Sequence, residues 1–190
     1  ISDFKDIIIN YDCVLYVYLS DAMNGDYKYI KVKEKQRWLI YGLEGYIGQK
    51  LKKILIKYDN IDVIKGSSRC EDYKSVEKEI IKYKPDRILS LIGRMYGDNI
   101  YTIKYLEDKM KLNINDNLYA PLTLANLCNK FNIHYTYFSS ACIFSYDEEH
   151  KMDCKNGFTD FDEANYYGSN YVLVKGFTDK ITFLINFSID

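Results

Sequence analysis

From Trp38 onward, short apolar runs alternate with longer segments in which apolar residues recur at helical spacing. The runs have the length of buried strands. Strands are expected at residues 38–41, 61–65, 87–93 and 133–139, and helices at about 46–58, 73–84, 102–111, 118–130 and 169–181. Pro85 ends the second helical segment, because proline cannot continue a helix. Strands that alternate with helices predict an α/β fold, a doubly wound parallel sheet of the Rossmann type with helices on both faces.

Residues 1–37 follow a different pattern. Two β-prone runs, 13–19 and 27–32, flank an Asn-Gly-Asp turn, and this predicts a hairpin. A charged stretch that ends at Arg37 offers no apolar face, so it indicates a linker. We therefore expect an N-terminal hairpin and linker with no assigned function, followed by one α/β domain over residues 38–190.

Composition and charge narrow the class of protein. The 190 residues suit one domain, and 47% hydrophobic with 28% charged residues is typical of a globular chain. No apolar run approaches the roughly 18 residues that a membrane span requires. The formal net charge of −1 offers no basic surface to a phosphate backbone. We expect no membrane or nucleic-acid partner, and a small-molecule ligand is favoured.

The cysteines and the chain ends bear on compartment. The five cysteines are odd in number and form no CxxC pair: Cys13, Cys70, Cys128, Cys142 and Cys154. This argues against a disulfide framework and a structural zinc site, so we expect no metal and a reducing compartment. The first ten residues lack the pattern of a secretory signal, so we expect a cytoplasmic protein. Because the chain begins with Ile rather than Met, we also expect a fragment of a longer protein.

A glycine-rich turn joins the first predicted strand to the first helix. Gly42, Gly45 and Gly48 have the spacing GxxGxxG, and Tyr46 and Ile47 open the helix at the point where a pyrophosphate would bind. The first glycine can adopt a positive φ, the second lets the backbone approach the phosphates, and the third allows close helix packing. A helix entry with incidental glycines is the alternative, but the flanking strand and helix favour a dinucleotide site.

The loop after the second strand, Gly66-Ser67-Ser68-Arg69, bears on the choice of dinucleotide. A dinucleotide-binding fold places here an acid for the ribose of NAD, or a cation for the 2′-phosphate of NADP. Two hydroxyls and a guanidinium, with Ser68 and Arg69 foremost, suit a phosphate, so NADPH is the favoured cofactor. A solvated loop arginine is the alternative, and Glu71 would be the acid if the strand ended later.

A Tyr-x-x-x-Lys pair places both side chains on one helical face, where the ammonium can lower the pKa of the phenol and hold the nicotinamide ribose. The pair occurs five times, starting at Tyr27, Tyr29, Tyr46, Tyr105 and Tyr171. Composition alone can therefore produce it. Only Tyr171 and Lys175 lie on a helix that follows the fourth strand, and this order of elements is what hydride chemistry requires.

Ser140 and Cys142 are two residues apart after the fourth strand, and they would point to the same side if the strand direction persisted. Ser140 would then hydrogen-bond a substrate carbonyl beside the Tyr171 phenol, and the Cys142 thiol would face the adjacent carbon. A small buried apolar residue is the alternative for Cys142, and without further context it is favoured. His134 and His150 show no plausible partner for metal binding or catalysis.

Several stretches together resemble one family of nucleotide-sugar enzymes. They are WLIYGLEGYIG, KPDRILSLIGR, NDNLYAPLTLANLC, ACIFSYD, GFTDFDEANYYGSNY and VKGFTDK. Through them the chain, from Trp38 to about Ile181, resembles the bifunctional UDP-4-keto-6-deoxyglucose 3,5-epimerase/4-reductases of UDP-rhamnose synthesis in plants and giant viruses, which are extended short-chain dehydrogenases/reductases. It is similar, more weakly, to dTDP-4-keto-rhamnose reductase and GDP-fucose synthase. Residues 1–37 match nothing in the family.

The resemblance implies an NADPH-dependent epimerase/reductase that converts UDP-4-keto-6-deoxyglucose to UDP-L-rhamnose. The expected ligand of this enzyme is a nucleotide-linked 4-keto-6-deoxy sugar, and the expected oligomer is a homodimer. Carried over by position, the site comprises a catalytic hydroxyl, a tyrosine–lysine pair, an epimerisation cysteine and a helix asparagine: Ser140, Tyr171, Lys175, Cys142 and Asn117. Gly93, at the end of the third predicted strand, is also expected to contact the cofactor.

The chain also departs from the family, and this leaves alternatives open. The second acid/base of epimerisation, a Lys or His in the substrate-binding part, would lie beyond Asp190, so we expect the substrate lobe to be largely missing. A reductase without epimerase activity and a non-catalytic NADP-binding module are the alternatives. A 4,6-dehydratase is disfavoured, because its acidic pair beside the catalytic hydroxyl is absent at Ala141-Cys142.

Overall fold

The computed structural model describes residues 35–152, 155–159 and 161–187. The hairpin expected before Arg37 lies outside the described residues. The first strand, β1 (Gln36–Tyr41), begins two residues earlier than predicted. Gln36 and Arg37 therefore belong to the sheet and not to a linker, because Gln36 pairs with Ile61 on the neighbouring strand.

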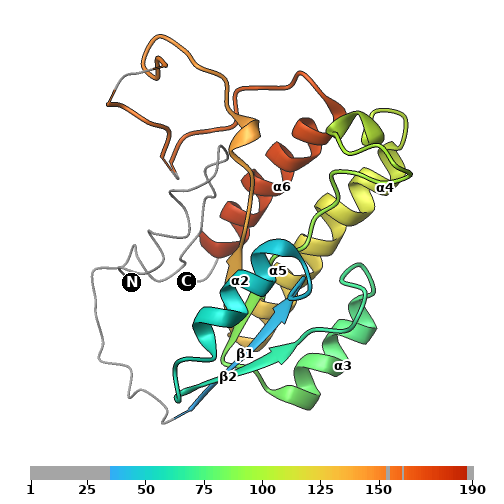
Figure 1. The fold of residues 1–190 in the computed structure, drawn as a ribbon, viewed down its shortest axis with the longest axis vertical. Helices are drawn as coiled ribbons and strands as arrows, with labels where there is room; N and C mark the ends of the chain where they lie inside the picture. Colours follow the sequence, from blue (N-terminus) through green and yellow to red (C-terminus); the bar gives the residue numbers. More distant parts are fainter. Residues whose placement is uncertain (1–34, 153–154, 160, 188–190) are drawn as a thin grey trace.

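In the described part of the chain, four parallel strands form one sheet, which confirms the predicted fold class (Figure 1). β1 lies between β2 (Ile61–Lys65) and β3 (Arg87–Ser90), and β4 (His134–Tyr137) pairs with β3. After β2 the chain crosses back over β1, so the direction of winding reverses there. In a doubly wound sheet, such a reversal leaves a crevice at the carboxyl ends of the strands. The strand order thus determines where a ligand site can form.

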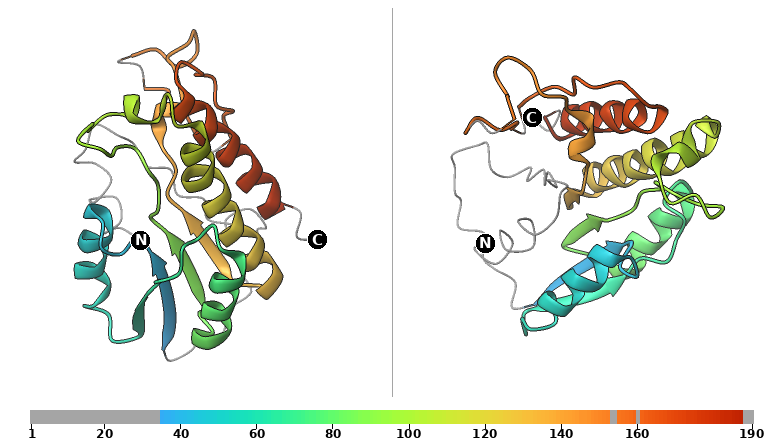
Figure 2. Two further views of the ribbon diagram at one scale, coloured as in Figure 1. Left: turned by 90° about the vertical axis from the view of Figure 1, so that its right-hand side faces the viewer. Right: turned by 45° about the horizontal axis from the view of Figure 1, so that its top comes forward.

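Helices cover both faces of the sheet. They are α2 (Tyr46–Leu55) on one face and α3 (Tyr73–Tyr83) and α5 (Ala120–Phe131) on the other, and a further helix, α6 (Asn170–Phe187), follows β4. Leu39 and Tyr41 join a cluster with residues of α3 and α5, whereas Ile40 joins a second cluster with residues of α2. α6 lies along α5 (Figure 2). Alternate residues of a strand point to opposite faces, so burial on both faces requires the nearly continuous apolar runs seen in the sequence. No helix of the described residues is long and apolar enough to span a membrane.

The ends of α3 show how local sequence sets a helix boundary. Asp72 caps the N-terminus, where its carboxylate accepts a hydrogen bond from the backbone N–H of Ser75 at 3.2 Å. Lys84 takes a left-handed conformation with φ of 45°, directly before Pro85. The stop that was predicted at this proline is confirmed.

The segment between β3 and β4 departs from the prediction of two separate helices. A separate 3-10 helix (Ile103–Leu106) comes first. After it, α4 (Met110–Ile114), a π-helical turn (Asn115–Tyr119) and α5 form one continuous helical run. Pro121 lies inside this run and has no N–H to donate to the carbonyl of Asn117. That carbonyl instead accepts a hydrogen bond from the Thr178 hydroxyl of α6 at 2.6 Å. A tertiary contact thus satisfies the group that proline leaves unpaired.

Candidate active site

A cleft of about 600 Å³ opens at the carboxyl ends of the strands. The loops after all four strands contribute to its lining, together with residues of the π-helical turn and of α6. Seven of the predicted site residues line it: Gly42, Gly45, Ser68, Arg69, Gly93, Tyr171 and Lys175. Six others do not: Tyr46, Ile47, Gly48, Asn117, Ser140 and Cys142. The fold therefore brings together residues that are up to 133 positions apart in the chain (Gly42 and Lys175).

The glycine turn adopts a conformation that other residues would strain. Gly42 has φ of +82°, and a Cβ on it would lie 2.8 Å from the carbonyl oxygen of Leu91. A Cβ on Gly48 would lie 2.5 Å from the carbonyl oxygens of Gly42 and Leu43, so Gly48 allows α2 to pack against the turn and does not face the cleft. Gly45 is the N-cap of α2, whose first turn carries no acidic residue. The first N–H groups of a helix have no partner within it, so this end of the cleft suits an anion.

A buried carboxylate that sequence reasoning missed organises the loop after β2. Glu79 of α3 accepts hydrogen bonds from the Tyr41 hydroxyl at 2.8 Å, from the Ser67 N–H and hydroxyl at 2.8 and 2.7 Å, and from the Ser68 N–H at 3.1 Å. Burial would raise the pKa of Glu79, but the donations from these groups outweigh it, so the pKa is lowered. The Ser67 hydroxyl is committed to Glu79, which corrects its predicted role as a phosphate ligand. A polar residue on the apolar face of α3, beside Val76 and Ile80, was the only signal in the sequence.

Arg69 is linked to two carboxylates at the edge of the cleft. Its Nε donates to Glu71 at 2.8 Å, and its Nη2 donates to Asp116 at 3.2 Å. β2 ends at Lys65 as predicted, so Glu71 does not take the strand-end position that the NAD alternative required. The hydrogen bond to Glu71 is the main reason that the pKa of Arg69 is raised. Asp116, which the sequence did not single out, also accepts from the Nε of Arg94.

Asn117 acts behind the cleft rather than in it. Its side chain accepts from the N–H of Arg94 at 2.8 Å and donates to the carbonyl of Arg94 at 2.8 Å. It also donates to the Asn113 side chain at 2.8 Å. A Cβ on Gly93 would lie 3.3 Å from the Asn117 amide oxygen. Asn117 therefore fixes the backbone of the loop after β3, which is the wall of the cleft at Gly93 and Arg94.

Tyr171 and Lys175 lie one turn apart on α6, and both line the cleft. Lys175 is buried, and this burial lowers its pKa to about 8. Its ammonium donates to the hydroxyl of Tyr137 and lies 4.6 Å from the centroid of that ring. Tyr137 sits at the end of β4 and was not predicted as a site residue, because a tyrosine in an apolar strand is typical of a core. A lysine that can lose its charge near neutral pH suits a site of proton transfer.

The argument that placed Ser140 and Cys142 on one side of a strand is wrong in its premise. β4 ends at Tyr137, and the chain turns into a short 3-10 helix (Ala141–Ile143). Ser140 caps this helix, because its hydroxyl accepts from the N–H of Cys142 at 3.3 Å. Cys142 is exposed, so the alternative of a buried apolar residue is also wrong. Ser139, which was not predicted, lines the cleft in place of these two residues.

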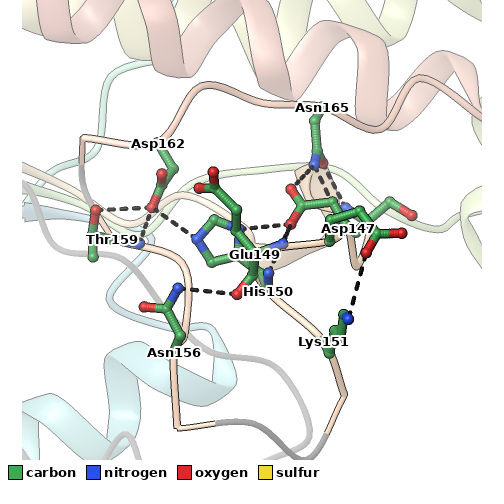
Figure 3. A network of polar contacts seen from close by, with 10 residues as sticks. Asp147, Glu149, His150, Lys151, Asn156, Thr159, Asp162 and Asn165 are labelled. Atoms are coloured by element: carbon green, nitrogen blue, oxygen red, sulfur yellow. Dashed lines mark hydrogen bonds and ion pairs between the residues drawn. The ribbon is translucent and has the colours of Figure 1, made fainter.

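His150 has partners that the sequence did not reveal (Figure 3). Its Nδ1 lies 2.9 Å from a carboxylate oxygen of Asp147, and its Nε2 lies 3.9 Å from one of Asp162. Its ring stacks on Phe158 with centroids 4.1 Å apart. The side chain of Asn165 also bonds to the backbone of Ser145. These contacts join the two ends of the loop before α6. Within the described ranges, no group of three or more His, Cys, Asp or Glu residues could hold a metal ion.

A viral protein is similar to this chain in both sequence and structure. Protein L780 of Acanthamoeba polyphaga mimivirus is 47% identical over 147 residues, which cover 76% of this chain and 50% of L780. The crystal structure of the L780 UDP-rhamnose synthase matches with a TM-score of 0.72 and 44% identity, over 80% of this chain and 53% of that one. The chain is therefore similar, over about half of its relative's length, to a UDP-rhamnose synthase. No protein-family model matches it.

More distant relatives are also nucleotide-sugar enzymes. A trifunctional UDP-glucose 4,6-dehydratase/UDP-4-keto-6-deoxy-D-glucose 3,5-epimerase/UDP-4-keto-L-rhamnose-reductase of Arabidopsis thaliana is 31% identical over 149 residues, which cover 78% of this chain and 22% of that protein. The dTDP-4-dehydrorhamnose reductase of Bacillus anthracis, solved in complex with NADP, shares 16% identity and a TM-score of 0.58 over 79% of this chain and 49% of that one, which shows the fold alone. The chain spans about half the length of L780.

Proposed function

We propose that this chain forms the NADPH-binding and ketone-reducing half of an enzyme that converts UDP-4-keto-6-deoxyglucose to UDP-L-rhamnose. The observation that carries the proposal is the single cleft that collects the glycine turn, Arg69 and the Tyr171–Lys175 pair. The 47% identity to L780, whose crystal structure is that of a UDP-rhamnose synthase, supports the substrate class. In this proposal residues 38–190 are the cofactor-binding domain, and most of the substrate lobe belongs to the half of the relatives that the chain does not span.

The residues of the cleft fit a phosphorylated nicotinamide dinucleotide. Gly42 lets the turn pass close to the backbone of Leu91, and with Gly45 it lines the end of the cleft where a pyrophosphate would lie at the N-terminus of α2. Arg69 would bond the 2′-phosphate at the end of β2. Lys175 and Tyr171 would meet the nicotinamide ribose at the other end. When bound, NADPH supplies the hydride that reduces the ketone at C4.

The chain's own residues would move the protons. Tyr171 would donate a proton to the oxygen that forms at C4, and the Lys175 ammonium would favour the phenolate that results. Because burial lowers the pKa of Lys175 to about 8, its charge is largely retained at pH 7 and is lost above pH 8. Ser140 would hold the carbonyl. Cys142 would exchange protons at C3 and C5, which the neighbouring ketone makes acidic, together with an acid/base on the substrate lobe.

One observation favours a reductase without epimerase activity as the second candidate. Tyr171 and Lys175 line the cleft, whereas Cys142 is exposed and does not. A reductase needs only the first two of these residues and a hydroxyl that holds the carbonyl. The two candidates differ in whether Cys142 is required for proton exchange beside the ketone.

Cofactor choice tests the proposal directly on this chain. Titration of nucleotide fluorescence should show NADPH bound about tenfold or more tightly than NADH, because a charge-assisted hydrogen bond contributes roughly 1.5–3 kcal/mol. Arg69→Ala should reduce this preference several-fold. Arg87→Ala is the matched control, since Arg87 opens β3 at the opposite end of the strand and does not line the cleft. Equal affinities of the wild-type chain for NADPH and NADH would refute the assignment.

A further inference from the structure

One buried carboxylate joins two arginines at the edge of the cleft. The Asp116 side chain is 10% exposed, and its two oxygens accept from different guanidinium groups, one from Arg69 and one from Arg94. Asp116 lies in the π-helical turn, Arg69 follows β2 and Arg94 follows β3. All three residues line the cleft. Asp116 therefore draws together two cations from separate loops on the side of the cleft where the 2′-phosphate of the cofactor would bind.

Both arginines keep donors that the protein does not use. A guanidinium carries five N–H donors. Arg94 uses Nε alone, and Arg69 uses Nε and Nη2, for the hydrogen bonds they make within the described part of the chain. The Arg94 and Arg69 side chains are 33% and 66% exposed, and both residues line the cleft. Two terminal nitrogens of Arg94 and one of Arg69 are thus available to a ligand oxygen.

Arg94 is held in place before any ligand arrives. The Asn117 side chain bonds to both the N–H and the carbonyl of Arg94, and Asp116 fixes the guanidinium. The hydrogen bond that Arg94 donates to Asp116 is the main cause of the raised pKa of Arg94, so the charge of Arg94 is permanent. Asp116 and Glu71 also balance the two positive charges, which keeps the guanidinium groups from repelling one another. A group that is already ordered loses less entropy on binding.

We propose that Arg94 is a second ligand, beside Arg69, for the 2′-phosphate that distinguishes NADPH from NADH, and that Asp116 is the residue that positions both side chains. The inference deepens the proposed function and rests on it. Two planar guanidinium groups on one phosphate give more donors in fixed directions than one exposed arginine could. The sequence indicates only Arg69, because Arg94 follows a different strand. The loops that carry the two arginines come near each other only in the folded sheet, where β1 lies between β2 and β3.

The experiment compares two probes that differ only in the phosphate concerned. Isothermal titration of the chain with 2′,5′-ADP and with 5′-AMP is carried out on wild type, Arg94→Gln and Arg87→Gln. Arg94→Gln should weaken 2′,5′-ADP about tenfold and leave 5′-AMP unchanged. Arg87→Gln, which removes an arginine outside the cleft, should change neither. Arg94→Lys should give an intermediate loss for 2′,5′-ADP, because it keeps the charge but not the fork.

The other outcomes separate this inference from the proposed function. If wild type binds 2′,5′-ADP more tightly than 5′-AMP and Arg94→Gln changes neither, or weakens both equally, Arg94 is not a 2′-phosphate ligand while the proposed function stands. If wild type binds both probes equally, the proposed cofactor itself is refuted, and this inference with it. If Arg94→Gln unfolds, Arg94→Lys is titrated in its place, and it should weaken 2′,5′-ADP while 5′-AMP stays unchanged.

Discussion

Replacement of Glu79 by glutamine tests how the cleft is built. Glu79 is 6% exposed and accepts four hydrogen bonds from Tyr41, Ser67 and Ser68, two on each carboxylate oxygen. Glutamine has nearly the same shape, but one of its two ends is an NH₂ group that cannot accept. One carboxylate oxygen accepts from the Ser67 N–H and hydroxyl, and the other accepts from the Tyr41 hydroxyl and the Ser68 N–H. In either orientation of the glutamine, one of these two sets of donors loses its acceptor.

The expected cost follows from those two lost bonds. A hydrogen bond to a charged group contributes about 1.5–3 kcal/mol, and part of each loss can be recovered by small shifts, so we expect Glu79→Gln to destabilise the chain by about 2–4 kcal/mol. This is a large share of the roughly 5–15 kcal/mol that stabilises a domain. The hydrogen-bond donors keep the pKa of Glu79 below its ordinary value of 4.5. The stabilisation is therefore present above about pH 4.5 and is lost as the pH falls through the lower folded value.

Urea unfolding followed by circular dichroism measures this effect. Glu77→Gln is the matched control, since it makes the same chemical change two residues earlier on α3, where Glu77 forms a partly exposed ion pair with Lys130 at 2.7 Å. Such a pair contributes about 0–1 kcal/mol. The difference between wild type and Glu79→Gln should also shrink below pH 4. Equal stability of the two variants, or a difference that does not depend on pH, would refute the role assigned to Glu79.

Three further predictions concern the chemistry, and those on catalysis apply to a protein that joins this chain to a substrate-binding half. Tyr171→Phe should abolish ketone reduction while NADPH binding stays nearly unchanged, measured as NADPH oxidation and by titration; reduction at the wild-type rate would assign the proton donor elsewhere. In wild type the reduction rate should fall above pH 8, whereas Lys175→Met should reduce slowly at every pH. Wild type should also gain stability relative to this variant as the pH rises from about 8 toward 10.5. In that range the unfolded chain keeps the lysine proton and the folded chain does not. Cys142→Ser should stop solvent deuterium from entering C3 or C5 of the 4-keto sugar while an already epimerised substrate is still reduced; unchanged exchange would favour the reductase alone.

The strands, most of the helices and the turn at Gly42 can be predicted from the sequence alone. These depend on local properties: the period of apolar residues, the absence of a Cβ, and the missing N–H of Pro85. Because both faces of the sheet are covered, its strands stand out as apolar runs. The same locality explains why the pair Tyr171 and Lys175 could be chosen from five, since its place after the fourth strand is a matter of order along the chain.

Which polar groups meet depends instead on the three-dimensional fold. Glu79 bonds Tyr41 across 38 residues, Arg69 bonds Asp116 across 47, and Lys175 bonds Tyr137 across 38. No periodicity encodes such pairs, because each depends on how the strand order and helix packing bring distant elements together. The turn at Ala141–Ile143 likewise could not be predicted from the alternation of side chains along a strand. A strand ends where its hydrogen-bonding neighbour ends, and β3 ends at Ser90, opposite Tyr137. The apolar pattern thus sets the layers of the fold, while the three-dimensional arrangement of those layers selects the charged residues that face the cleft.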